Sequence, residues 1–245
     1  MASISVPNPY SARRRPVAPL VRRLFSLSGV AALGSFLVFH LAINSTALQS
    51  DAAFDRAVSF LHRTPGLAWA EVLLVFVPLA FHAAIGLWLV VANAPLSGRS
   101  PYPPAVRAAV RASGVGALAF LAMHLAELRL REPGARMGGA ELATVLAADL
   151  SSTLHGFPLR GSAYLVGTAC VTFHFAAGLW AWFARTRAGA RPRSRRWVAW
   201  SVAAVGAAMW AQLANVVVFH ATGARLFGSP TEDADPSRLP CPEGD

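Results

Sequence analysis

At residues 173–180 the chain reads Phe-His-Phe-Ala-Ala-Gly-Leu-Trp, deep inside an apolar segment. An earlier copy of this pattern, Phe-His-Ala-Ala-Ile-Gly-Leu-Trp, occupies residues 81–88. A second pattern is also doubled, because Phe-Leu-Val-Phe-His-Leu-Ala at residues 36–42 returns as Phe-Leu-Ala-Met-His-Leu-Ala at residues 120–126. Four histidines in two matched pairs therefore lie within apolar sequence.

The composition is that of a protein that crosses a membrane several times. Of the 245 residues, 55% are hydrophobic and only 14% are charged, which is too little charge for a soluble domain. Apolar segments cover residues 24–48, 67–93, 107–129, 160–184 and 197–221. Each has about the 20 residues that a helix needs to cross a bilayer. The sequence thus predicts an all-α membrane protein with five transmembrane helices.

The distribution of arginine predicts the orientation of these helices. All 22 basic residues are arginine; five precede the first helix or lie at its start, three lie in or just after the second connection, and six in the fourth. By the positive-inside rule we expect the N-terminus in the cytoplasm and the C-terminus outside. This also explains the net charge of +10 without a nucleic-acid partner. We expect a cytoplasmic arm (1–19), a membrane domain (20–221) and a flexible acidic outer tail (222–245).

Depth along the helices sorts the four histidines into two levels. His40 and His124 each lie about 25 Å from the cytoplasmic end of an outward-running helix, at about 1.5 Å per residue. His82 and His174 lie about 20 Å from the outer end of inward-running helices, so this inner pair is about 15 Å closer to the cytoplasm than the outer pair. Each level has one imidazole from each of two parallel helices. Such a pair holds a haem between two axial ligands and leaves iron no open position.

These histidines have a plainer explanation as well, since a single histidine in a membrane helix is more often a packing or hydrogen-bonding residue than a ligand. The duplicated sequence and the matched depths favour two haem b groups, bound by a bundle of the first four helices. The other histidines, His62, His155 and His220, are expected to bind no ligand. A zinc site is not expected, because no cysteine or carboxylate cluster lies at either level.

Small residues near the histidines support this interpretation. Gly86 and Gly178 each follow an inner histidine by four residues, so they share its helix face and leave room for a porphyrin. Gly29 and Gly114 are expected to do the same on the helices of the outer pair. Pro78 lies inside the second span, four residues before its histidine, and is expected to kink that helix and free a carbonyl.

Residues outside these pairs complete a recognisable combination. They are Arg22-Arg23-Leu24-Phe25-Ser26-Leu27, Phe36-Leu37, Asn44, Glu71, Phe76-Val77-Pro78-Leu79-Ala80-Phe81, Glu127, Arg129, Phe173, Phe175, Gly178-Leu179-Trp180 and Pro192-Arg193-Ser194-Arg195-Arg196. With them, residues 20–220 resemble the single-chain, five-helix, dihaem cytochrome b anchor of succinate dehydrogenase and fumarate reductase. Two features depart from that family: Phe25 stands where it often has histidine, and the acidic tail with Cys241 extends past its usual end.

The resemblance implies electron transfer at the cytoplasmic membrane. In that family a flavoprotein oxidises succinate, and an iron–sulfur subunit passes the electrons to the anchor. The haem of His82 and His174 would receive them, and the haem of His40 and His124 would pass them to quinone, often menaquinone. The flow could also reverse, with quinol reducing fumarate. The implied partners are those two subunits, quinone and the lipid bilayer.

Carboxylates near the outer haem are the candidate quinone and proton groups. Glu71 begins the second span, and Glu127 lies one turn beyond His124 with Arg129 nearby. The plainer alternatives are that Glu71 marks the membrane interface and that Glu127 and Arg129 form a structural ion pair.

Arg22 and Arg23, adjoining Ser26, are the expected contacts of haem propionates, because guanidinium binds carboxylates through paired hydrogen bonds. The positive-inside rule alone explains most of the other arginines.

Two other functions stay open on the sequence alone. One is a dihaem cytochrome b that serves another membrane dehydrogenase or a hydrogenase. The other is a non-redox transporter or proton channel that uses the histidines as a relay, and it would contain no haem.

Overall fold

The computed structural model describes residues 17–94, 96, 100–128, 142–187, 189 and 191–228. The regular elements in these ranges are helices, and one isolated bridge between Leu154 and Phe157 is the only β pairing within them. The predictions for Arg129, for most of the N-terminal arm and for the tail beyond residue 228 lie outside the described residues.

Within the described ranges, five helices are long and apolar enough to cross a membrane. The first is a continuous rod of α1 (Pro19–Leu27), η1 (Ser28–Leu33), α2 (Gly34–Ser45) and η2 (Thr46–Leu48). The second consists of α4 (Leu67–Glu71), η3 (Val72–Phe76) and α5 (Val77–Val91), and the other three are α6 (Pro104–Leu128), α9 (Leu159–Phe183) and α10 (Pro192–Thr222). The predicted all-helical fold with five spans is confirmed.

The first two spans each contain a wide π turn, η1 and η3. In the second span η3 ends at Phe76, two residues before Pro78. In a regular helix the proline ring would clash with the carbonyl four residues earlier, and the wide turn takes up this disruption. π turns are frequent at functional sites, and η1 begins at Ser28, which contacts a histidine of the inner pair.

The last span ends in a tight reversal of the chain. Gly223 follows α10 with a φ of 73°, in the left-handed region that favours glycine. The buried side chain of Asn215 then holds the returning chain, because it accepts from Leu226 N at 2.7 Å and donates to Phe227 O at 3.1 Å. The C-terminal end of α10 is thereby covered by the chain that follows it.

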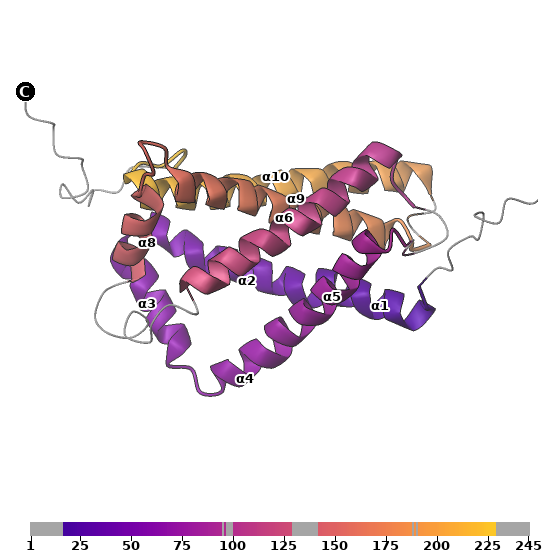
Figure 1. The fold of residues 1–245 in the computed structure, drawn as a ribbon, viewed down its shortest axis with the longest axis horizontal. Helices are drawn as coiled ribbons and strands as arrows, with labels where there is room; N and C mark the ends of the chain where they lie inside the picture. Colours follow the sequence, from indigo (N-terminus) through magenta and orange to yellow (C-terminus); the bar gives the residue numbers. More distant parts are fainter. Residues whose placement is uncertain are drawn as a thin grey trace, which may run out of the picture.

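Two shorter helices, α3 (Asp51–His62) and α8 (Leu142–Ser151), were not predicted. Ser50 caps α3 by accepting a hydrogen bond from Ala53 N at 3.1 Å. The two helices lie at the same end of the molecule (Figure 1) and pack against each other there. Phe54 of α3 and Ala143 and Leu146 of α8 form a buried cluster with Ala47 of η2.

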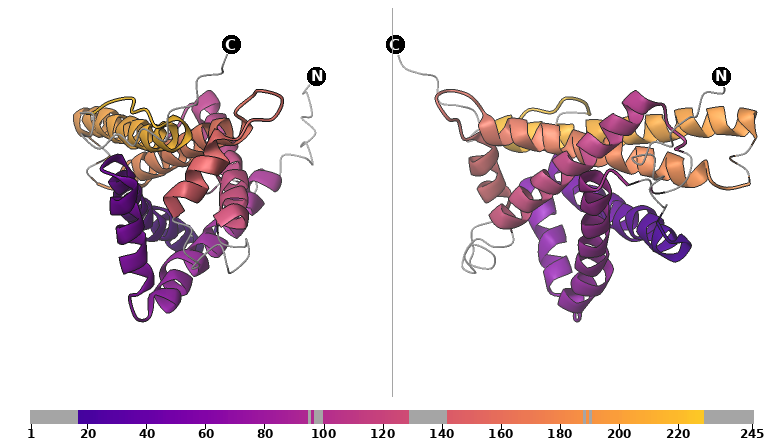
Figure 2. Two further views of the ribbon diagram at one scale, coloured as in Figure 1. Left: turned by 90° about the vertical axis from the view of Figure 1, so that its left-hand side faces the viewer. Right: turned by 45° about the vertical axis from the view of Figure 1, so that its right-hand side comes forward.

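The long helices surround a central space. α9 lies beside α10 and beside α6, and α10 also contacts α2 and α8. The second span lies on the side of the molecule away from α10 (Figure 2), whereas the first span contacts it through α2. The predicted bundle of the first four spans is therefore completed by α10, part of which also lines the cavity between the helices.

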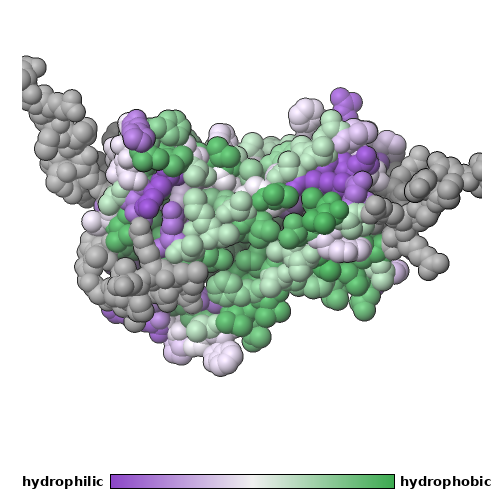
Figure 3. All heavy atoms as spheres, viewed as in Figure 1, coloured by the Kyte–Doolittle hydropathy of each residue, from purple (hydrophilic) through white to green (hydrophobic). Residues whose placement is uncertain are grey.

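The outside of the molecule is apolar where a bilayer would contact it. Figure 3 shows hydrophobic residues across the middle of one face and hydrophilic residues gathered toward both ends. On the second span, Leu74 is 65% exposed and Val91 is 78% exposed. Apolar surface this extensive is a property of proteins that face lipid.

Candidate haem-binding cavity

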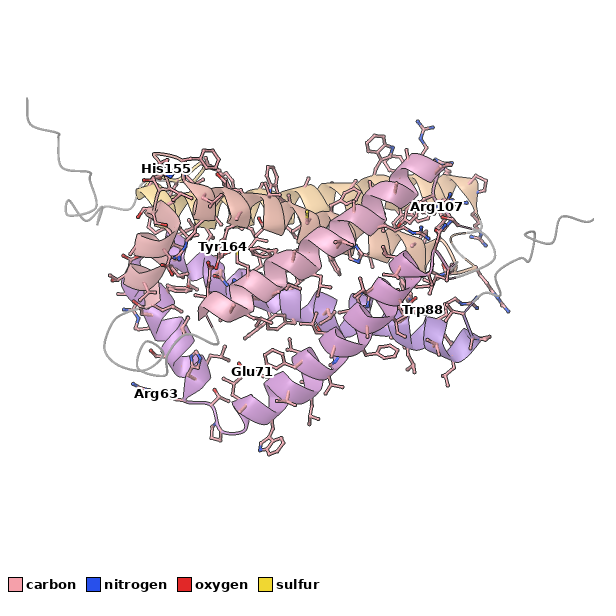
Figure 4. The ribbon with its side chains drawn as sticks, in the orientation of Figure 1. Arg63, Glu71, Trp88, Arg107, His155 and Tyr164 are labelled. Carbon is pink, nitrogen blue, oxygen red and sulfur yellow. The ribbon has the colours of Figure 1, made fainter. Side chains whose placement is uncertain are left out.

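All four predicted histidines line one cavity of about 1140 Å³. Typical pockets for a single small ligand have about 300–1,000 Å³, so this cavity is larger than the usual range for one such ligand. Glu71 and Tyr164, which both line it, lie in the half of the molecule that contains α3 and α8, whereas Arg107 lies at the opposite end (Figure 4). The cavity thus extends along the bundle and crosses both predicted levels.

The inner pair consists of His82 on α5 and His174 on α9. Their ring centroids are 6.2 Å apart and their planes are nearly perpendicular, at 86°. Two imidazoles on opposite sides of one metal ion have centroids about 6 Å apart, because each metal–nitrogen bond is about 2 Å long. The spacing therefore fits two axial ligands of one iron.

Backbone carbonyls from neighbouring spans orient both inner rings. Nδ1 of His82 lies 3.2 Å from Phe25 O, and Nδ1 of His174 lies 3.1 Å from Val110 O. A carbonyl only accepts, so Nδ1 carries the proton in each ring and the Nε2 lone pair stays free for a metal. Such outer contacts fix the tautomer and orientation of metal-binding histidines.

A serine completes each of these contacts in the same way. Ser28 Oγ lies 3.2 Å from Nδ1 of His82 and donates to Phe25 O, while Ser113 Oγ lies 3.5 Å from Nδ1 of His174 and donates to Val110 O. Both serines stand in a Ser-Gly-Val sequence, at residues 28–30 and 113–115. This repeat was visible in the sequence but was not used to predict a site.

The glycines of these two sequences accommodate the imidazole rings themselves. A Cβ atom on Gly29 would lie 2.5 Å from Cε1 of His82, and one on Gly114 would lie 2.8 Å from Cε1 of His174. Both glycines were expected to make room for porphyrin, and the structure instead packs them directly against the inner histidines. Only a residue without a side chain permits this approach.

Gly86 and Gly178 border open space, as a porphyrin between the helices would require. Both line the cavity. A Cβ on Gly86 would meet only Phe25, at 3.8 Å, and one on Gly178 would have no neighbour within 4 Å. Phe25 itself stacks on the ring of His82, with centroids 4.3 Å apart and planes 5° apart.

The outer pair consists of His40 on α2 and His124 on α6, with ring centroids 5.9 Å apart and planes at 85°. This spacing also fits two axial ligands of one iron. Each ring is stacked on the phenylalanine four residues earlier, Phe36 at 5.4 Å and Phe120 at 5.6 Å. The doubled sequence pattern thus produces a doubled local geometry.

A chain of polar side chains leads outward from His124. Its Nδ1 lies 3.3 Å from the hydroxyl of Tyr164, which donates to Oε2 of Glu127 at 3.0 Å. Arg160 at the start of α9 lies 3.8 Å from Glu127 and also pairs with Asp149 on α8. Because the hydroxyl proton of Tyr164 goes to Glu127, its oxygen accepts from His124. Sequence reasoning missed Tyr164, since only the fold brings these helices together.

The two predicted carboxylates have different surroundings. Glu127 is 18% exposed and engaged by Tyr164 and Arg160, so its described partner is Arg160, whereas Arg129 lies outside the described residues. Glu71 lines the cavity itself. Of the two, Glu71 is placed where a ligand in the cavity can reach it.

Arginines gather at the other end of the cavity. Ser26 lines it, but Arg22 and Arg23 are not among the described lining residues, which include Arg107, Arg111 and Arg185. Arg185 donates to Ser26 Oγ at 3.2 Å. Burial lowers the pKa of Arg185 below its ordinary value, an effect that Tyr102 opposes and Arg22 increases. Arg185 is an exposed cation at the rim of this end of the cavity.

The described residues contain no group of three or more His, Cys, Asp or Glu side chains that could hold a metal ion. Each level of the cavity offers two imidazoles instead. This donor set suits iron held in a macrocycle, which supplies the remaining ligands itself.

A comparison with known proteins identifies the family. Over 176 residues the chain is 32% identical to the succinate dehydrogenase cytochrome b558 subunit of Bacillus subtilis, covering 71% of this chain and 83% of that subunit. The chain belongs to the succinate dehydrogenase cytochrome b membrane-anchor family. No family model matches the sequence, and no solved structure matches it.

Family membership confirms the resemblance predicted from the sequence. It agrees with the five apolar helices, since a cytochrome b anchor of succinate dehydrogenase is a membrane subunit of a larger enzyme. The roles of individual residues stay predictions, and the spacing of the two histidine pairs in the cavity supports them.

Proposed function

We propose that this chain is the dihaem cytochrome b subunit of a succinate:quinone oxidoreductase. It anchors the flavoprotein and iron–sulfur subunits to the membrane and carries electrons between the iron–sulfur subunit and quinone, with menaquinone as the expected quinone. The same path serves quinol:fumarate reduction when it runs in reverse. The Bacillus relative is named as a cytochrome b subunit of succinate dehydrogenase, which supports both the cofactor and the enzyme.

The observation that carries the proposal is the pair of facing imidazoles at each level of one cavity. His82 and His174 are the proposed ligands of the inner haem, and His40 and His124 those of the outer haem. Haem supplies one-electron transfer when it is bound, and two axial histidines leave iron no position for oxygen. The protein holds the inner rings through Nδ1, and the two Nε2 atoms would be the ones that bind the iron.

Gly86 and Gly178 leave the space that the inner porphyrin occupies in this proposal. The arginine-lined end of the cavity suits the negative propionates, with Arg185, Arg107 and Ser26 as nearest candidates. Arg22 and Arg23, the arginines predicted from sequence, remain candidates for the same end, where Arg22 is close enough to affect Arg185.

The arginine-rich end is proposed to face the cytoplasm and the partner subunits, in keeping with the positive-inside rule. The end with α3 and α8 then faces outward, and quinone binds there, near the outer haem. Glu71 is the better candidate for proton exchange with quinone, because it lines the cavity, whereas Glu127 is not among the described lining residues.

The test is to purify the tagged chain with its partners and record a reduced-minus-oxidised spectrum. We expect co-purification of a flavoprotein and an iron–sulfur protein, two haem b per chain and succinate:quinone activity. A preparation without a b-type band contradicts the dihaem assignment and favours a relay transporter. Two haems without succinate-dependent reduction would assign the chain to a different dehydrogenase.

A further inference from the structure

His220 is a buried histidine outside both predicted pairs. It lies in the last turn of α10 and is 3% exposed. Both of its ring nitrogens lack a hydrogen-bond partner in the part of the chain that the structure describes. Neutral imidazole has one donor and one acceptor nitrogen, and the large majority of buried polar side-chain atoms in proteins have a partner. The two ring nitrogens of His220, without hydrogen-bond partners among the described residues, therefore indicate that the protein binds a ligand there.

His220 is one of the residues that line the cavity containing the outer histidine pair. Phe54 of α3, another part of the cavity wall, meets it edge to face with ring centroids 5.6 Å apart. Around Phe54 the wall is hydrocarbon, formed by Val58, Leu128, Leu142 and Leu146. A ligand at this point is thus held by apolar side chains and one imidazole.

The charge distribution favours an uncharged ligand. The described arginines on the cavity wall, Arg107, Arg111 and Arg185, lie at the end of the bundle where α6 begins and α9 ends. α10 ends at the opposite end, beside α8. At that end Arg160 is engaged by Glu127 and Asp149, and the guanidinium carbon of Arg225 lies 5.5 Å from the centroid of the Phe219 ring. An anionic propionate is better matched by the arginine-lined end than by His220.

We propose that His220 binds the quinone head group through a hydrogen bond, an inference that rests on the proposed function. A quinone is a planar, uncharged ring whose carbonyl oxygens accept hydrogen bonds, and quinol hydroxyls also donate them. The imidazole matches both forms, because its N–H donates to the carbonyl and its other nitrogen accepts from the hydroxyl. Phe54 provides an aromatic surface beside it for the ring.

The test uses the complete complex with His220→Leu and His220→Gln, and with His155→Asn as the matched control. His155 is exposed, is not among the described cavity-lining residues and has a φ of 51°, which Asn tolerates. The probe is menadione, a naphthoquinone without a tail, titrated by calorimetry and used as the acceptor in steady-state assays. His220→Leu should weaken its binding and raise its KM about fivefold to tenfold, the effect of one lost hydrogen bond.

His220→Gln should retain most of the affinity, since its amide also donates and accepts. The control should match the wild type, and all variants should keep both haem spectra. Unchanged menadione affinity in His220→Leu overturns the inference. A gain in stability alone would show only that leucine replaces a buried imidazole without described hydrogen-bond partners. A shifted potential of one haem with unchanged affinity assigns the imidazole to a propionate and overturns it too. A wild-type complex without b-type haem or quinone reduction refutes the proposed function itself.

Discussion

Replacing Gly114 by alanine tests how closely the protein backbone approaches the inner histidine pair. The new Cβ would lie 2.8 Å from Cε1 of His174, whereas carbon atoms in contact are about 3.5–4.0 Å apart. The imidazole must therefore move by about 1 Å, because the Cβ is fixed to the helix. Metal–ligand distances tolerate only about 0.2 Å. We expect Gly114→Ala to lose the inner haem and to keep the outer one.

The variant should still fold. Overpacking of this kind costs about 1–3 kcal/mol, and alanine in a helix offsets roughly 0.5–1 kcal/mol of that relative to glycine. Gly116→Ala is the matched control, since it lies on the same helix two residues later. Its Cβ would approach Sγ of Cys170, also at 2.8 Å, and no histidine is within 4 Å among its nearest neighbours. Both variants carry the same gain in helix propensity and a similar clash.

Haem content by the pyridine haemochrome assay, with a redox titration of the purified complex, distinguishes the two variants. Gly114→Ala should contain one haem per chain with the remaining potential unchanged, and Gly116→Ala should contain two. Two haems in Gly114→Ala would refute the assignment of His174 as a ligand held against this glycine. One haem in both variants would mean that any clash between α6 and α9 is enough to remove a haem, so the loss would not depend on contact with His174.

Three further predictions follow from individual contacts. His82→Ala and His174→Ala should remove the same haem from the reduced-minus-oxidised spectrum, and His40→Ala the other; two haems in His82→Ala would contradict the pairing. Tyr164→Phe removes the acceptor of His124 Nδ1 and should raise the potential of one haem by about 20–60 mV in a redox titration, leaving the other unchanged. Asn215→Ala frees two backbone groups of the returning chain and should destabilise the protein by about 1–3 kcal/mol in thermal unfolding, with haem content intact.

The spans and the juxtaposition of the histidines were predictable because both follow from counting residues along rigid helices. A helix rises by a constant amount per residue, so depth can be read from sequence position. The short helices α3 and α8 were not predicted. They lie in the connections between spans, and each is too short for its hydrophobic periodicity to stand out in the sequence. In hindsight α3 had a signal in the cap Ser50 followed by apolar Phe54, Val58 and Leu61.

Contacts between helices were not predictable in the same way, because they depend on how each helix is rotated about its axis. The partners of the inner Nδ1 atoms are carbonyls, which every residue has, so residue identity alone does not reveal Phe25 or Val110. His220 was expected to bind nothing because no other histidine matched its depth. Its burial, its contact with Phe54 of α3 and its place on the cavity wall became visible only in the folded structure.

The two histidine pairs differ in what orients them, and this difference has a functional consequence. The inner rings are held by backbone carbonyls of Phe25 and Val110, which carry no net charge and cannot ionise. The outer ring of His124 is held by Tyr164, which leads to the charged pair of Glu127 and Arg160 near the end of the bundle. A carboxylate behind a hydrogen-bonded imidazole makes that imidazole a stronger donor to a metal, and a cation beside the carboxylate weakens the effect. In the proposed dihaem arrangement, charged side chains near the outer pair can therefore adjust the potential of its haem, whereas the Nδ1 neighbours of the inner pair are backbone carbonyls and the hydroxyls of Ser28 and Ser113, which carry no charge.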